Sequence, residues 1–134
     1  MSGYLIDSCV ILDLVLDDPE WAEWSEETLS ECSVHSKLFI NPIIYTEVSI
    51  GFERIEELES ILLKGGFEML YMPREALFLA GKVFLKYRKR QGIKRSPLPD
   101  FYIGAHAAVQ GLTLVTRDQN RFKTGFPTLD IVHP

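Results

Sequence analysis

The segment Tyr4-Leu5-Ile6-Asp7 near the start of the chain combines a short apolar run with a carboxylate at its end. An apolar run of this length that stops at a turn residue is typical of a buried strand. Four later runs have the same character, namely Leu38–Ile40, Phe67–Tyr71, Leu112–Thr116 and Leu129–Val132. The sequence therefore predicts five strands.

Helical patterns separate these runs. Asp18-Pro19 is an N-cap followed by proline at the first helical position, and Asn41-Pro42 repeats the signal before a helix that carries Glu47. In the helix expected after Asp18-Pro19, the residues that lie on one face are Trp21, Trp24, Thr28, Leu29 and Cys32.

Three more helices are expected in the second half of the chain. They span residues 52–64, stopped by Gly65-Gly66, then a long stretch from Pro73 with the stripe Leu77, Ala80, Val83, Phe84 and Tyr87, and finally Asp100–Gln110 with Gly111 as its cap. The stretch Gln91–Pro99 is the one candidate mobile loop.

Strands that alternate with helices are typical of an α/β domain with helices on both faces of a parallel sheet. A chain of 134 residues suits one domain, residues 1–134. We therefore expect a three-layer α/β/α sandwich around a mainly parallel, five-stranded sheet.

Composition and charge indicate in which compartment the protein is expected and which classes of partner it favours. No apolar run reaches the roughly 18 residues of a membrane span, and Cys9 and Cys32 form no CxxC motif, so we expect a reduced, cytoplasmic protein without a membrane. The net charge of −5 argues against general nucleic-acid binding. The charge is uneven, however, because residues 1–36 hold nine carboxylates and no Lys or Arg.

Four carboxylates are expected at one edge of the sheet. Asp7 ends the first strand and Asp118 follows the fourth, whereas Glu47 and Asp100 are expected near the starts of helices that run antiparallel to the strands. All four then lie at the carboxyl edge, where open α/β sheets bind ligands.

Such crowding requires either raised pKa values or a bound cation. Oxygen ligands favour Mg²⁺ or Mn²⁺, and a metal-bound water can attack a phosphodiester. The alternative is that the aspartates are turn or cap residues. Glu47 is the most informative, because a carboxylate beside Ile43, Ile44 and Val48 is costly unless it is paired or metal-bound.

Four segments resemble the motif blocks of PIN domains, most closely the VapC-type toxins of toxin–antitoxin pairs. They are Tyr4-Leu-Ile-Asp-Ser8, Ile44-Tyr-Thr-Glu47, Leu98-Pro-Asp-Phe-Tyr-Ile-Gly-Ala-His-Ala107 and Leu112-Thr-Leu-Val-Thr-Arg-Asp118. The resemblance covers essentially the whole chain. It implies a Mg²⁺- or Mn²⁺-dependent ribonuclease that forms a homodimer, with metal-binding catalytic acids at Asp7, Glu47, Asp100 and Asp118, and with Ser8 and Thr116 supporting them.

The chain departs from the family pattern at several positions. Many relatives have His-Phe where this chain has Arg121-Phe122, and Gly104 and His106 replace a commoner alanine and threonine. Cys9 stands where a small residue is frequent; we expect it to be packed rather than nucleophilic, because no histidine is placed to activate it. None of these changes removes a carboxylate.

Other charged residues have simpler interpretations. Asp13, Asp17, Asp18 and Asp130 are expected to be surface or cap residues, and His106 does not share the helical face of Asp100. A basic segment runs from Lys86 through Arg88, Lys89, Arg90 and Lys94 to Arg95 and is either a solvated helix end or a phosphate-binding strip. Candidate RNA contacts are Arg88, Arg90, Lys94, Arg95, Arg117 and Arg121.

The leading hypothesis is an endoribonuclease toxin restrained by a cognate antitoxin. The acidic helix Asp18–Glu31 offers a basic partner a docking surface, and Trp21 and Trp24 are either core residues or an anchor for that partner. The alternatives are a stand-alone, structure-specific nuclease of the same fold and a non-catalytic metal-binding interaction module.

Overall fold

A five-stranded parallel sheet forms the centre of the molecule in the computed structural model, which describes residues 2–91 and 98–134. Its strands are β1 (Tyr4–Ile6), β2 (Leu38–Ile40), β3 (Phe67–Met69), β4 (Thr113–Val115) and β5 (Ile131–Val132). They lie in the order β3-β2-β1-β4-β5, and all four pairings are parallel.

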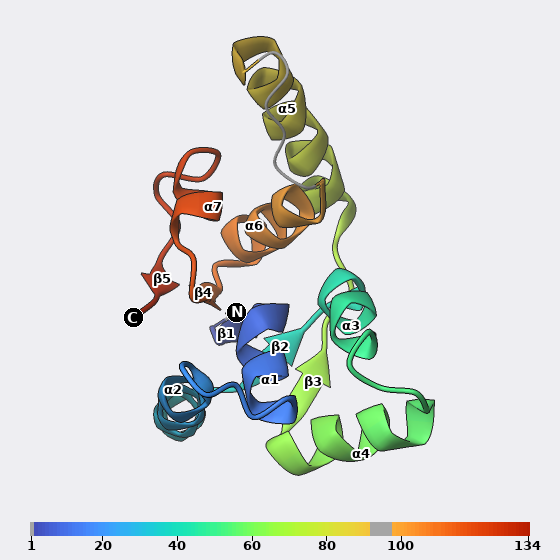
Figure 1. Cartoon of the computed structure of the whole chain (residues 1–134). Coiled ribbons are helices and arrows are strands. Elements are labelled where there is room, and N and C mark those ends of the chain that lie inside the picture. The colour runs from blue at the N-terminus through green and yellow to red at the C-terminus, as the bar shows by residue number, and fades with distance from the viewer. Residues whose placement is uncertain (1, 92–97) are drawn as a thin grey trace.

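Helices connect the strands in the alternation that the sequence predicts (Figure 1). They are α1 (Ser8–Val15), α2 (Ala22–His35), α3 (Pro42–Ser49), α4 (Ile55–Gly65), α5 (Arg74–Gln91), α6 (Leu98–Gln110) and α7 (Asn120–Lys123). From β1, the strands β2 and β3 follow on one side of the sheet, and β4 and β5 follow on the other side. Right-handed crossovers therefore place helices on both faces, and the predicted α/β architecture is confirmed.

The bounds of several elements differ from the prediction. The sequence reading missed α1, which begins directly after β1 and buries Val10 and Ile11. The prediction that Asp18 caps α2 is wrong, because the Asp18 carboxylate accepts hydrogen bonds from the backbone N–H groups of Glu20 and Trp21 and so forms a separate turn before the helix.

The second half of the chain shows smaller differences. The helix expected over residues 52–64 begins at Ile55, and the last strand is shorter than expected. The sequence predicts a loop over residues 91–99. Its first residue belongs to α5 and its last two belong to α6, while residues 92–97 lie outside the described part of the chain. No helix in the described ranges has the length and apolar character needed to cross a membrane.

A buried polar link joins α3 to α6, the helices that carry Glu47 and Asp100. Asn41 caps α3 by accepting from the Ile44 N–H, and its amide nitrogen lies 3.0 Å from His106 Nδ1. His106 is fully buried, and this burial lowers the pKa of its imidazole. A neutral His106 therefore accepts from Asn41 and fixes the spacing of the two helices.

Gly104 of α6 packs directly against an aromatic ring. A Cβ atom at this position would lie 2.4 Å from the ring of Phe126, which is itself buried. Gly81 of α5 is the opposite case, because a Cβ atom there would meet no other group within 4 Å. The glycine at 104 is therefore required by packing.

We expect Gly104→Ala to destabilise the protein by about 1–3 kcal/mol, because the ring of Phe126 must move. The matched variant Gly81→Ala should instead stabilise it by about 0.5–1 kcal/mol, since glycine inside a helix costs backbone entropy. Urea unfolding of both variants tests this difference. Equal stabilities for the two variants would show that the ring of Phe126 moves aside without lowering the free energy of unfolding.

Candidate metal site

Asp7 is the centre of the site and is completely buried. It follows β1, and its backbone N–H donates to the carbonyl of Val115 on β4. This bond holds Asp7 between β1 and β4, where the order of the strands in the sheet reverses. Its Oδ1 accepts from the Ser8 N–H at 2.8 Å and so caps α1. The carboxylate therefore has a structural role in addition to any function.

Thr116 connects Asp7 to the segment that carries Asp118. The Thr116 hydroxyl donates to Asp7 Oδ2 at 2.8 Å and accepts from the Asp118 N–H at 3.2 Å. Thr116 is fully buried, so this geometry is protected from water. The structure thus places Thr116 beside the acids that the sequence predicts it to support.

Glu47 reaches the same site from α3. Its Oε1 accepts a hydrogen bond of 2.9 Å from the Ser8 hydroxyl, and burial together with the charge of Asp7 raises the pKa of its carboxyl. The expectation that Glu47 lies near the start of its helix is wrong, because it is the sixth of eight residues in α3. It reaches the sheet edge because α3 packs against α1, which begins with Ser8.

Asp100 carries an unsatisfied buried oxygen. The residue is only 4% exposed, and its Oδ2 has no hydrogen-bond partner. Burial is the main reason why the pKa of this carboxyl rises to about 6, and the charges of Asp7, Glu47 and Asp118 raise it further. Asp100 therefore feels the charges of the other three predicted acids, of which Asp118 is exposed and accepts from the Asn120 N–H through its Oδ1.

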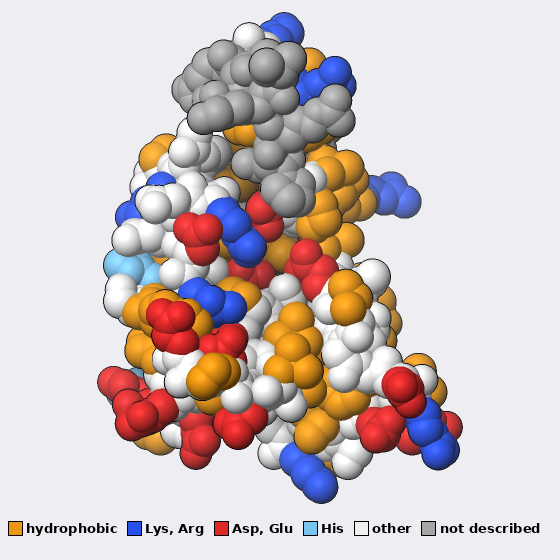
Figure 2. Space-filling view, viewed as in Figure 1, with side chains coloured by type: hydrophobic (Ala, Val, Ile, Leu, Met, Phe, Trp, Pro, Cys, Tyr) orange, Lys and Arg blue, Asp and Glu red, His pale blue; other side chains and the backbone are white. Residues whose placement is uncertain are grey.

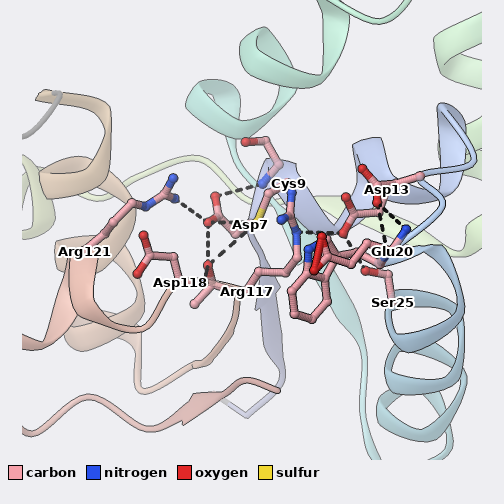
Figure 3. Close-up of polar contacts among 12 residues, drawn as sticks. Asp7, Cys9, Asp13, Glu20, Ser25, Arg117, Asp118 and Arg121 are labelled. Atoms are coloured by element: carbon pink, nitrogen blue, oxygen red, sulfur yellow. Dashed lines mark hydrogen bonds and ion pairs between the residues drawn. The ribbon is translucent and has the colours of Figure 1, made fainter.

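Arg121 contacts two of these carboxylates, that of Asp7, toward which it points in Figure 3, and that of Asp100. Its Nη2 is 2.6 Å from Asp7 Oδ2 and 3.4 Å from Asp100 Oδ1. Burial lowers the pKa of the guanidinium, but the neighbouring carboxylates outweigh that effect and raise it. Within residues 2–91 and 98–134, no three acidic, histidine or cysteine side chains are already arranged to hold a metal ion.

The prediction that Asp13 is a surface or cap residue is wrong. Asp13 is 3% exposed, and its Oδ2 accepts from the Ser25 hydroxyl at 2.8 Å and lies 2.9 Å from Arg117 Nε. Arg117 also covers the ring of Trp21, with 5.4 Å from its guanidinium carbon to the ring centroid. Figure 3 shows Arg117 directed toward Asp13, whereas Arg121 points toward Asp7.

Arg117 is therefore engaged in an ion pair with Asp13, and its phosphate contact stays a prediction. Sequence reasoning missed this pair because its members are distant in the chain. The available signal was an acid on the apolar stretch Val10–Val15. Asp17 and Asp130 are exposed, as predicted.

Cys9 lies next to Asp7 and is half-buried, with its Sγ 3.5 Å from Asp7 Oδ2. Burial, with a further contribution from the Asp7 charge, raises the pKa of this thiol to about 11. The thiol therefore stays protonated at neutral pH, which agrees with its interpretation as a packed residue.

The described part of the basic segment lies on α5. Lys86, Arg88 and Lys89 are exposed there, toward the end of α5 that projects from the molecule in Figure 1. The side chain of Arg90, and Lys94 and Arg95, lie outside the described residues. Phosphate binding by this segment stays a prediction.

The family model "PIN domain" matches residues 4–126, a range that contains every acid of the site. The chain belongs to the PIN domain family. The resemblance noted in the four sequence segments is thereby confirmed.

Solved structures show the same fold. This PIN domain resembles a chain of VapBC2 from Rickettsia felis, in a crystal structure with promoter DNA, with a TM-score of 0.75 and 19% identity over 100% of this chain and 99% of that one. It also resembles a chain of VapBC-1 from Haemophilus influenzae, with a TM-score of 0.73 and 22% identity over 99% and 98% of the two chains. A toxin–antitoxin complex from Klebsiella pneumoniae gives 0.64, with 21% identity over 97% and 96%. A search of curated proteins returns no match.

The stability of the metal-free protein should depend on Asp100. Because the folded-state pKa is raised from 3.8 to about 6, the ionised form destabilises the fold above pH 6 by up to about 3 kcal/mol, and this penalty disappears as the pH falls toward 4. In EDTA, Asp100→Asn should therefore raise the melting temperature at pH 7.5 by several degrees, and by much less at pH 4.

The exposed Asp130→Asn is the matched control and should melt like the wild type at both pH values. A melting temperature of Asp100→Asn equal to or below that of the wild type at pH 7.5 would indicate that Asp100 chiefly stabilises the fold through Arg121.

Proposed function

We propose that this PIN domain is a Mg²⁺- or Mn²⁺-dependent endoribonuclease, the toxin of a VapBC-type toxin–antitoxin pair. The observation that carries the proposal is the unpartnered Oδ2 of Asp100, a buried carboxylate oxygen among three other acids. A buried acceptor without a donor is costly, and a cation is the partner that also relieves like-charge repulsion. The oxygen-only set of donors suits a hard cation such as Mg²⁺ or Mn²⁺.

The side chains of such a site would have different roles. Asp7 and Asp100 would hold the ion, and Glu47 and Asp118 would complete the site or orient the attacking water. Ser8 keeps Glu47 in place by donating to it, and Thr116 does the same for Asp7. A divalent ion bound here supplies an activated water and neutralises charge that develops on the phosphate.

The central experiment measures metal binding and RNA cleavage on the same preparations. Wild type should bind Mn²⁺ in isothermal titration and cleave at least one member of a panel of tRNA, rRNA and mRNA only when metal is present. Asp100→Asn should weaken Mn²⁺ binding about tenfold or more and reduce cleavage in parallel, because one ligand charge is lost.

Asp130→Asn serves again as the control, since it removes the same charge from an exposed position. Full cleavage by Asp100→Asn would contradict the four-carboxylate site. Adding hairpin and flap substrates to the panel tests the stand-alone, structure-specific nuclease, which would prefer them to linear RNA.

An antitoxin is the expected partner, because a nuclease that acts on cellular RNA requires restraint. The named relatives are VapBC complexes and a toxin–antitoxin complex. In this chain, α2 exposes Glu23, Glu26, Glu27 and Glu31, and acidic side chains gather over α2 in Figure 2. Trp24 packs on the core and Trp21 lies under Arg117, which favours a packing role for both tryptophans over a partner anchor.

The partner can be tested by co-expression with any small protein that is encoded next to this one. Reversing two charges on α2, as Glu23→Lys with Glu27→Lys, should weaken the complex and reduce the salt dependence of what binding is left, because attractive charge pairs with a basic partner are lost. Glu57→Lys on α4 is the control for a charge reversal at an exposed position away from α2. If a basic residue of the partner displaces the metal, inhibition should decline as Mg²⁺ rises. Complete inhibition at all Mg²⁺ concentrations would instead indicate steric cover.

A homodimer is part of the same proposal. Leu77, Phe78 and Leu85 of α5 are exposed, with Phe78 68% accessible, and they form an apolar surface that a second copy of the chain would cover. Sedimentation of the wild type and of Phe78→Glu tests this arrangement. A monomeric wild type would contradict it.

One observation favours the non-catalytic interaction module. Arg121 already contacts Asp7 and Asp100, so a buried ion pair alone accounts for part of the cluster. Metal binding without cleavage of any RNA in the panel would support this alternative.

A further inference from the structure

The carboxylate site already contains a cation supplied by the chain itself. The guanidinium of Arg121 lies within ion-pair distance of both Asp7 and Asp100, the two acids expected to hold a divalent ion. These carboxylates are almost completely buried, whereas the side chain of Arg121 is 36% exposed. Arg121 therefore approaches the two acids from the solvent side.

The hydrogen bonds of Asp7 show where another cation has to enter. Asp7 accepts from the Ser8 N–H, the Thr116 hydroxyl and the Cys9 thiol, and each of these donors comes from a buried or half-buried residue. Arg121 is the one exposed residue among the four donors to Asp7. A divalent ion that reaches Asp7 from water therefore meets the guanidinium first.

The backbone that carries Arg121 is held in place by a neighbouring residue. Phe122, the next residue of α7, is fully buried and fixes the helix against the core. The arginine stem has several rotatable bonds, so the charged end can move while the backbone stays in place.

We propose that Arg121 is an internal competitor of the divalent cation, which holds Asp7 and Asp100 together in the metal-free protein and must be displaced when the metal binds. This inference rests on the proposed metal-dependent function. The exchange is governed by charge: one guanidinium neutralises one carboxylate among four acids, whereas Mg²⁺ or Mn²⁺ neutralises two. Arg121 thereby sets the metal concentration at which the site fills.

The test compares Arg121→Met with Lys123→Met, which removes the same charge from the same short helix at an exposed position. In EDTA, Arg121→Met should melt at a lower temperature than the wild type, because two buried carboxylates lose their counter-ion. In isothermal titration, it should bind Mn²⁺ about tenfold more tightly or better, corresponding to at least about 1.4 kcal/mol. Lys123→Met should match the wild type in both measurements.

Two further variants make the result specific. Arg121→Lys keeps a charge but loses the planar fork, so its Mn²⁺ affinity should fall between those of the wild type and Arg121→Met; it also replaces Arg121→Met if that variant does not fold. Introducing Arg121→Met into Asp100→Asn should give a smaller gain in Mn²⁺ affinity than in the wild type, since one of the contested ligands is gone.

The outcomes separate this inference from the proposed function. Unchanged or weaker Mn²⁺ binding by Arg121→Met overturns the competition, and RNA cleavage by the wild type then still supports the nuclease. Tighter binding by Arg121→Met, with no cleavage by any variant, supports the competition and contradicts the nuclease. Absence of Mn²⁺ binding in both proteins overturns both.

Discussion

The buried carboxylate of Asp7 is the interaction on which the rest of the site depends. It ends β1, caps α1 through the Ser8 N–H, and receives the Thr116 hydroxyl from the end of β4. One side chain thus joins two neighbouring strands and a helix at the topological switch of the sheet. Because Asp7 is completely buried, its charge must be balanced locally, and the surrounding groups are arranged accordingly.

That balance connects folding to chemistry. The same burial that makes Asp7 rigid makes an additional carboxylate nearby expensive, as the pKa of about 6 for Asp100 shows. Arg121 relieves part of this cost but leaves Asp100 Oδ2 without a partner. A site with this residual charge and a rigid frame is prepared to bind a cation, at the expense of stability when the cation is absent.

Sequence reasoning was most successful where local rules apply. Asp7, Asp100 and Asp118 follow from strand ends and helix positions, because parallel topology brings those positions to one edge. It failed for Asp13, whose burial depends on Arg117, a residue more than a hundred positions away. The position of Glu47 in α3 was also wrong, because the packing of α3 against α1, rather than the helix start, brings Glu47 to Ser8. Side-chain pairing across elements is a tertiary property that no local pattern encodes.

The connection from β4 to α7 is constrained at both ends by buried acids. Thr116 and Arg121 are directed to Asp7, while Arg117 between them is directed to Asp13 on the other side. Adding or deleting one residue here would shift Thr116, Arg117 or Arg121 relative to the acid that it contacts and leave a buried carboxylate without its partner. Natural variation in chain length should therefore be absent from this connection and be confined to segments such as the α3–α4 turn, where Gly51 and Glu53 face solvent at least in part.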